Sequence, residues 1–194
     1  EAAAENNIPL IVLDRPNPNG HYIDGPILDT AYRSFVGMHP IPIVHGMTIG
    51  EYSQMINGER WLKDSVECDL TVITMLGYNK QIPYDLPIKP SPNLPNSQAV
   101  NLYPSLCLFE GTNVSVGRGT DLPFQHFGAP FLESDYSFVP KSRLGAKNPK
   151  YEGERCYGQD LSQFAKLSQL DLSFLTDAYK ACQKKEDFFN SFFD

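Results

Sequence analysis

The chain has 194 residues, of which 41% are hydrophobic and 20% charged, an ordinary composition for a globular protein. Its formal net charge of −7 argues against non-specific binding to nucleic acid or to an anionic membrane, because both need a basic surface. No apolar run approaches the roughly 18 residues of a membrane span. The polar start, EAAAENN, shows no signal peptide, and a trimmed secreted protein would look the same.

The first part of the chain predicts a strand, a helix and a second strand. Apolar, β-branched runs indicate buried strands over residues 8–14 and 69–76. Between them, residues 48–57 predict a helix, with Thr48 and Glu51 in the positions of a capping box. Strand, helix, strand is the signature of a parallel βαβ unit, so we expect the two strands to pair in parallel under that helix.

The texture of the sequence changes between residues 79 and 97, where five prolines impose an extended path typical of a connector. Beyond it, residues 98–103 predict a short helix and residues 106–110 a strand. Residues 133–160 are polar and predicted to be irregular. The region 167–193 is predicted to be helical, with a buried stripe at helical spacing formed by Leu170, Phe174, Leu175, Ala178 and Cys182.

Polar side chains follow the first predicted strand at its C-terminal end, where open α/β sheets bind ligands. Asp14, Arg15 and Asn17 come directly after that strand, although an Asp–Arg pair there can also be purely structural. His45 precedes the predicted helix, whose dipole favours a neutral imidazole. It could contact a polar ligand there, or it could simply cap or pack.

A second candidate site is the stretch EGTNVSVGRGTDLPFQHFGAP, residues 110–130, which combines four glycines with a carboxylate, an amide and a guanidinium. Glu110 could be a general acid, a base or a substrate clamp, or it could pin the loop through backbone N–H groups. Arg118 lies between two glycines that would let the backbone approach a ligand, and its guanidinium suits a carboxylate or a phosphate. Alternatively it ties down its own loop.

Metal, serine-hydrolase and thiol chemistry lack support in this sequence. HExxH, GxSxG and GxxxxGK[ST] motifs are absent, and the four cysteines form no CxxC pair, which leaves a disulfide open. The remaining inventory of carboxylates, amides, arginine and aromatic residues is typical of carbohydrate sites, where carboxylates carry out the chemistry.

Several strings taken together resemble the NamZ-type exo-β-N-acetylmuramidases, long catalogued as a domain of unknown function. They are VLDRPNPNG (12–20), IPIVHGMTIGE (41–51), LTVITMLGY (70–78), SPNLP (91–95) and YPSLCLFEGTNVSVGRGTDLPFQHFGAPF (103–131). The resemblance implies a bacterial glycoside hydrolase that releases terminal N-acetylmuramic acid from peptidoglycan fragments in cell-wall recycling. It implies hydrolysis by water without cofactor or metal, and a periplasmic or secreted location.

The resemblance also implies an α/β fold. The end of a Rossmann-like subdomain would span residues 1–80, the proline-rich connector 81–97, and a second α/β (α+β) subdomain 98–194, with the sugar site in the cleft between the subdomains. Glu110 is then the candidate catalytic residue on this chain. The residues implied to bind substrate are Asp14, Arg15, Asn17, His45, Asn93, Asn113, Arg118 and Thr120, of which the two arginines could clamp the lactyl carboxylate.

Two departures from the family pattern affect this reading. The Pro-Glu-His-Gly motif, whose glutamate is the favoured catalytic carboxylate, is absent, and so is the Tyr-Thr-Tyr segment that usually precedes LDRPNP. We therefore expect a middle-to-late part of the enzyme, with the general acid upstream of Glu1, an uncovered apolar face on its sheet and no activity by itself. The alternatives are a non-catalytic carbohydrate- or cell-wall-binding module and a nucleotide-binding unit.

Overall fold

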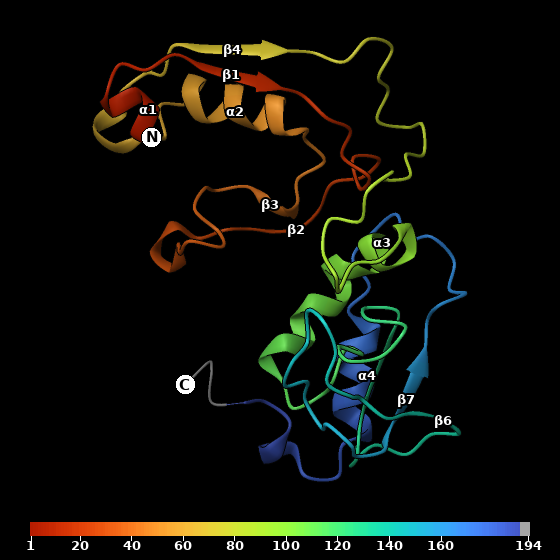
Figure 1. The fold of residues 1–194 in the computed structure, drawn as a ribbon. Helices are drawn as coiled ribbons and strands as arrows, with labels where there is room; N and C mark the ends of the chain where they lie inside the picture. Colours follow the sequence, from red (N-terminus) through yellow and green to blue (C-terminus); the bar gives the residue numbers. More distant parts are fainter. Residues whose placement is uncertain (191–194) are drawn as a thin grey trace. The chain divides into compact units, whose positions relative to one another are not determined.

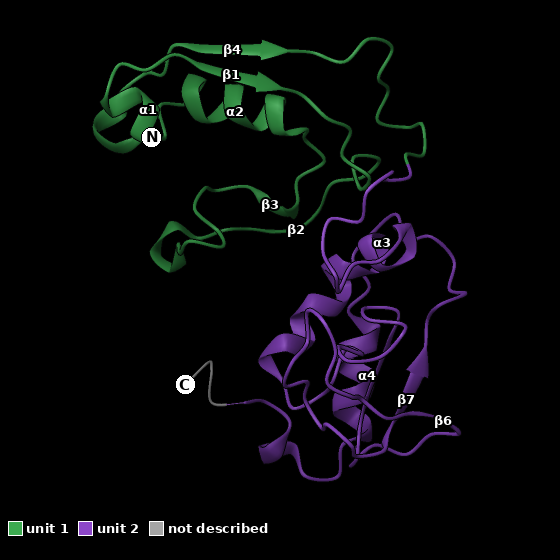
Figure 2. Ribbon diagram, viewed as in Figure 1, with its two compact units in different colours: residues 1–84 green, residues 85–194 purple. Residues whose placement is uncertain are grey.

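The computed structural model describes residues 1–190, in which helices and strands are mixed throughout, as expected for an α/β protein (Figure 1). The chain divides into two compact units (Figure 2). Unit 1 is Glu1–Tyr84 and unit 2 is Asp85–Asp194, described as far as residue 190.

Unit 1 contains the predicted βαβ arrangement. Strand β1 (Leu10–Leu13) pairs in parallel with β4 (Leu70–Ile73), with Leu10 opposite Leu70 and Leu13 opposite Ile73. Helix α2 (Ile49–Gly58) lies between them in sequence and packs against both strands, along one face of the pair (Figure 1). The parallel pairing and the position of the helix confirm the prediction.

Helix α2 begins where its capping box places it. The Thr48 hydroxyl accepts a hydrogen bond from the Glu51 backbone N–H at 3.1 Å, and the Glu51 carboxylate accepts one from the Thr48 backbone N–H at 2.9 Å. Both donors would otherwise be orphaned at the helix start. This local chemistry explains why the helix start could be predicted from sequence.

The remaining elements of unit 1 are short. Helix α1 (Ala2–Glu5) is a single turn at the start of the chain. Strand β2 (Asp24–Ile27) pairs antiparallel with β3 (Pro42–Val44). Strand β2 was not predicted, because its region contains many turn-forming residues.

The prediction that both strands of the β1–β4 pair are buried is wrong for one face of the pair. Val72 faces α2, since its Cγ1 would lie 2.7 Å from a Cβ added at Gly50 in the helix. Alternation along a strand turns the neighbouring side chains to the other face, where Ile11, Leu13 and Ile73 are 64%, 70% and 52% exposed. The expected uncovered apolar face is therefore present.

The proline-rich stretch holds no helix or strand between residues 79 and 96, apart from an isolated bridge between Ser91 and Leu94. This confirms the prediction that it has little regular structure. The boundary between the two units, after Tyr84, falls inside it.

Unit 2 begins with helix α3 (Ser97–Leu106), which continues into a 3₁₀ helix, Cys107–Gly111. The prediction of a helix here is confirmed, but the predicted strand over 106–110 is wrong. A short apolar run fits a strand or a buried helix equally well. The helical path prevails because it buries Leu102, Leu106 and Phe109 in the same core.

A three-stranded antiparallel sheet follows, in the order β5 (His126–Ala129), β7 (Cys156–Asp160), β6 (Tyr136–Phe138). The prediction of an irregular region over 133–160 is therefore wrong for β6 and β7. Glycine is uncommon in strands, so Gly158 argued against a strand at β7. The pairing of β7 with β5 nevertheless requires this glycine. A Cβ there would lie 1.9 Å from the Phe127 carbonyl oxygen of β5.

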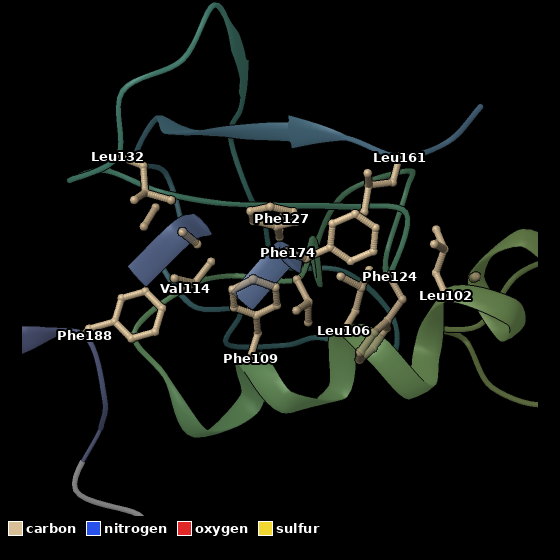
Figure 3. Close-up of a cluster of buried hydrophobic side chains, with 14 of the residues drawn as sticks. Leu102, Leu106, Phe109, Val114, Phe124, Phe127, Leu132, Leu161, Phe174 and Phe188 are labelled. Atoms are coloured by element: carbon tan, nitrogen blue, oxygen red, sulfur yellow. The ribbon is translucent and has the colours of Figure 1, made fainter. Parts of the chain in front are cut away.

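The main hydrophobic core lies in unit 2, where α3, the sheet and helix α4 (Ser173–Ala181) contribute side chains (Figure 3). The predicted helix over 167–193 is shorter than expected, and its last positions lie outside the described residues. Its predicted stripe holds in part, because Phe174, Ala178 and Cys182 are buried.

Within residues 1–190, no helix is long and apolar enough to cross a membrane, and no cluster of His, Cys, Asp and Glu could hold a metal. All four cysteines are described and none forms a disulfide. Burial raises the pKa of Cys107 to about 11 and that of Cys156 to about 12, so both thiols stay protonated at neutral pH.

Candidate functional site

The residues predicted to bind substrate, together with the candidate catalytic residue Glu110, form two groups in different units. The first comprises Asp14, Arg15, Asn17 and His45 in unit 1, and the second comprises Asn93, Glu110, Asn113, Arg118 and Thr120 in unit 2. Their roles stay predictions, and the structure defines the contacts of their side chains.

Asp14 joins the end of β1 to the start of α2. Its Oδ2 accepts a hydrogen bond from the Thr48 hydroxyl and its Oδ1 one from the Gly50 backbone N–H, both at 2.8 Å. A Cβ at Gly50 would lie 2.7 Å from the Asp14 carboxyl carbon, which explains the glycine. The carboxylate thus satisfies donors at the helix N-terminus.

His45 is neutral, and its ring carries one N–H donor. Its Nδ1 accepts a hydrogen bond from the Met47 backbone N–H at 3.1 Å, so the ring proton lies on Nε2. The ring stacks on Tyr52 at 5.6 Å between centroids. Burial, and then the charge of Lys80, lower the pKa of His45, which favours the neutral form.

A cavity of about 440 Å³ brings part of the first group together. Arg15, Asn17, His45 and Tyr52 line it beside the start of α2. The Asn17 side chain is engaged, because its Nδ2 donates to the Met47 carbonyl at 2.8 Å. No ion pair of Arg15 is found within residues 1–190. The cavity therefore offers N–H donors to hydroxyl or carboxylate oxygens.

In unit 2, Glu110 and Arg118 form an ion pair. Nη2 of Arg118 donates to Oε1 of Glu110 at 2.6 Å, and both side chains are half-buried. The guanidinium also lies over the Phe124 ring, 5.0 Å from its centroid. Glu110 belongs to the 3₁₀ helix after α3. The predicted strand over 106–110, which would have ended at Glu110, is not formed.

The glycines of this loop have a packing reason within the protein. A Cβ at Gly117 would lie 2.2 Å from the His126 ring, and a Cβ at Gly119 would lie 2.7 Å from the Lys141 carbonyl oxygen. Both also have positive φ, +78° and +83°, which favours glycine. Close approach to a ligand is not needed to explain them.

His126, which the sequence reasoning did not single out, organises the same loop. Its Nδ1 lies 2.6 Å from the Tyr136 hydroxyl and its Nε2 lies 2.9 Å from Thr120 Oγ1. The Thr120 hydroxyl donates to the Gly117 carbonyl at 2.7 Å, so it accepts the Nε2 proton. Burial lowers the pKa of His126 to about 4, and the ring is neutral.

Asn93 and Asn113 brace neighbouring segments. Nδ2 of Asn93 donates to the Gly145 carbonyl at 2.9 Å, and Nδ2 of Asn113 donates to the Asp187 carbonyl at 2.7 Å. Asn93 is buried, and it holds the turn that precedes Lys147.

Unit 2 contains a cavity of about 580 Å³, called the basic pocket. It is lined by Glu110, Arg118, Lys147, Asn148, Lys150 and residues 114–116 and 145–146. The Lys150 ammonium donates to the Thr112 and Val114 carbonyls. Sequence reasoning missed both lysines, although the basic run KSRLGAKNPK (141–150) in an acidic chain was a usable signal.

Two family models together match almost the whole chain. The family model described as exo-β-N-acetylmuramidase NamZ, N-terminal, matches residues 1–98, and its C-terminal counterpart matches residues 101–194. The chain belongs to the NamZ family. A peptidoglycan β-N-acetylmuramidase NamZ of Bacillus subtilis (strain 168) is 50% identical over 139 residues, which cover 69% of this chain and 33% of that protein.

Two crystal structures of DUF1343 family proteins from Bacteroides fragilis NCTC 9343 are similar to this NamZ family member. The first has a TM-score of 0.95 and 54% identity, and the match covers 99% of this chain and 56% of that one. The second has a TM-score of 0.77 and 29% identity, with 96% and 56% covered. The chain thus spans about a third of the curated relative and just over half of each solved structure.

Proposed function

We propose that the natural protein carrying this chain is an exo-β-N-acetylmuramidase, a glycosidase that releases terminal N-acetylmuramic acid from peptidoglycan fragments. The observation that carries the proposal is the match of both NamZ family models, in order, over residues 1–98 and 101–194. The B. subtilis relative, named a peptidoglycan β-N-acetylmuramidase, supports it. Because the substrate derives from peptidoglycan, we propose a periplasmic or secreted location.

In this proposal the chain supplies substrate-binding groups from both units. The cavity beside α2 offers Arg15, Asn17 and the Nε2–H of His45 to sugar hydroxyls or a carboxylate. In unit 2, Arg118 is the candidate clamp for the lactyl carboxylate, because its planar fork suits bidentate binding. Glu110 remains the candidate catalytic residue on this chain.

We further propose that residues 1–80 belong to a Rossmann-like subdomain, that 81–97 form a connector, and that 98–194 belong to a second subdomain. The parallel β1–α2–β4 unit supports the first assignment. The division of the chain after Tyr84 and the family-model boundary between residues 98 and 101 support the others.

An assay of the natural protein on a chromogenic N-acetylmuramide tests the activity. We expect release of the chromophore, with no binding of NAD or ATP in a parallel titration. Sugar binding without any release would favour a non-catalytic binding module over an enzyme. The name of the B. subtilis relative, which is that of an enzyme, does not favour the binding module. Binding of a nucleotide instead of the sugar would overturn the proposal.

A further inference from the structure

The basic pocket concentrates positive charge in an otherwise acidic chain. Arg118, Lys147 and Lys150 line it with a single carboxylate, Glu110, whereas the whole chain has a formal net charge of −7. In the part of the chain that is described, Glu110 pairs with Arg118 and neither lysine has an ion-pair partner. The pocket thus holds three cations and one carboxylate, which leaves an excess of positive charge.

Lys150 is held in place by the loop that lines the pocket. Its ammonium donates to the Thr112 and Val114 carbonyls. An ammonium has three N–H donors, so one remains for a ligand. Burial lowers the pKa of Lys150, and the nearby Glu110 offsets part of that effect. A desolvated cation of this kind gains more from an anion beside it than an exposed lysine does.

Arg118 is oriented and still has donors to spare. Its contact with Glu110 uses Nη2, and its face lies over Phe124. A guanidinium carries five N–H donors, so a second acceptor can bind beside Glu110. The contact with Glu110 and the Phe124 ring thus orient the guanidinium.

The opposite wall of the pocket is preformed. Nδ2 of Asn93 fixes the Gly145 carbonyl, and a Cβ at Gly145 would lie 2.5 Å from Pro92. This packing sets the turn that leads to Lys147. A preformed cavity of about 580 Å³ has the size of a small-molecule site and loses little entropy on binding.

We propose that the basic pocket binds the lactyl carboxylate of N-acetylmuramic acid between Arg118 and Lys150, with Lys147 adding positive charge, an inference that rests on the proposed function. N-Acetylglucosamine lacks the lactyl group and offers only hydroxyls and a neutral amide, so it gains less from these cations than a carboxylate does. Lys147 and Lys150 are thus specificity-determining residues that select N-acetylmuramides over N-acetylglucosaminides.

The test is calorimetric titration of the natural protein with free N-acetylmuramic acid and with N-acetylglucosamine. Lys150→Met should weaken binding of N-acetylmuramic acid about tenfold or more, the scale of a lost hydrogen bond to a charged group, and leave N-acetylglucosamine unchanged. Lys147→Met should act in the same direction but less, and Lys150→Arg should restore part of the preference. Lys166→Met, an exposed lysine outside the pocket, is the matched control and should change neither affinity.

Lys150 also braces two carbonyls, so the ratio of the two affinities is the deciding quantity. Damage to the loop would weaken the binding of both sugars to the same extent, and Lys150→Arg would not restore it. That result overturns the inference. If the lysine variants keep the wild-type preference while the protein still releases N-acetylmuramic acid, the pocket assignment fails and the proposed function stands. If no sugar is released but N-acetylmuramic acid binds in a Lys150-dependent way, the proposed function fails and the pocket stands.

Discussion

Single residues of unit 2 show how a loop rich in glycine acquires one conformation. His126 links the Tyr136 hydroxyl to Thr120, and Thr120 closes onto the Gly117 carbonyl. Gly117 has no side chain because the imidazole occupies that space. A buried, neutral histidine therefore stabilises the loop that carries Arg118 through its hydrogen bond with Thr120.

His126 should make the stability of the protein depend on pH. Burial lowers the pKa of this histidine to about 4, whereas an unfolded chain gives about 6.5. The stabilisation that the neutral imidazole gives to the folded state is thus complete above pH 6.5 and is lost as the pH falls towards 4. Between pH 7.5 and 5 we expect a loss of roughly 2 kcal/mol in the free energy of unfolding.

Urea denaturation of wild type and His126→Gln at both pH values measures this loss. The variant should be less stable at pH 7.5 and should show the smaller change with pH, because glutamine does not titrate. The other histidines cancel in this comparison. Equal changes in the two proteins would show that His126 is not the titrating group.

Arg118 should contribute to substrate binding and not only to loop structure. Arg118→Ala in the natural protein is expected to weaken binding of an N-acetylmuramide by about 1.5–3 kcal/mol, the scale for a hydrogen bond to a charged group. The loss should be smaller for an N-acetylglucosaminide. Inhibition constants for the two sugars measure it, with Arg155→Ala as a control whose guanidinium donates to Ser137 outside the basic pocket. Equal losses on both sugars would mean that Arg118 only braces its loop.

At the scale of elements, features that leave a pattern in the sequence could be predicted, including the parallel β1–β4 pairing, whereas features set only by contacts with distant residues could not. The start of α2 depends on Thr48 and Glu51, three residues apart, and was predicted correctly. The run 106–110 was assigned as a strand because its apolar pattern does not distinguish a strand from a buried helix. Strand β7 was missed because its glycine is required by Phe127, some thirty positions earlier, which no local pattern reveals.

The candidate site divides in the same way. The sequence singled out Glu110 and Arg118, which meet in the structure. The sequence also indicated Asp14 and Asn113 as ligand groups, and their hydrogen bonds in the structure are to backbone and side chains of the protein itself. Lys150 was overlooked because its proximity to the Thr112 and Val114 carbonyls arises only from folding.

Thr48→Ala should destabilise unit 1 by about 1–2 kcal/mol. The substitution removes the acceptor for the Glu51 N–H and the donor to Asp14. Thr48→Ser keeps the hydroxyl and is the matched control. Thermal and urea unfolding followed by circular dichroism measure both variants, and similar losses for alanine and serine would contradict the capping argument.

Gly158→Ala should disrupt the sheet of unit 2. The new methyl group would clash with the Phe127 carbonyl oxygen, so β5 and β7 must separate, at a cost of about 1–3 kcal/mol or more. Gly58→Ala in α2 meets no atom within 4 Å and should leave stability unchanged or raise it slightly. Amide exchange across β5 and β7 reports the difference, and unaltered protection in Gly158→Ala would refute it.

For the molecule as a whole, apolar surface is distributed unevenly between the units. Unit 2 encloses its aromatic and aliphatic side chains in one core (Figure 3). Unit 1 covers only the face of its β1–β4 pair that α2 packs against, and Ile11, Leu13 and Ile73 extend from the other face. An apolar patch of this kind binds other apolar surfaces or dyes when nothing covers it.

This chain should therefore bind a hydrophobic fluorescent dye through unit 1. The combined substitution Ile11→Thr, Leu13→Thr and Ile73→Thr keeps β-forming residues in both strands and removes apolar area, so it should lower dye fluorescence and any self-association. Leu144→Thr, at a similarly exposed position in unit 2, is the control and should have a much smaller effect. Dye titration and sedimentation measure both, with circular dichroism to verify the fold. Unchanged fluorescence in the triple variant would mean that the β1–β4 face is covered in solution, against the exposure of these three side chains.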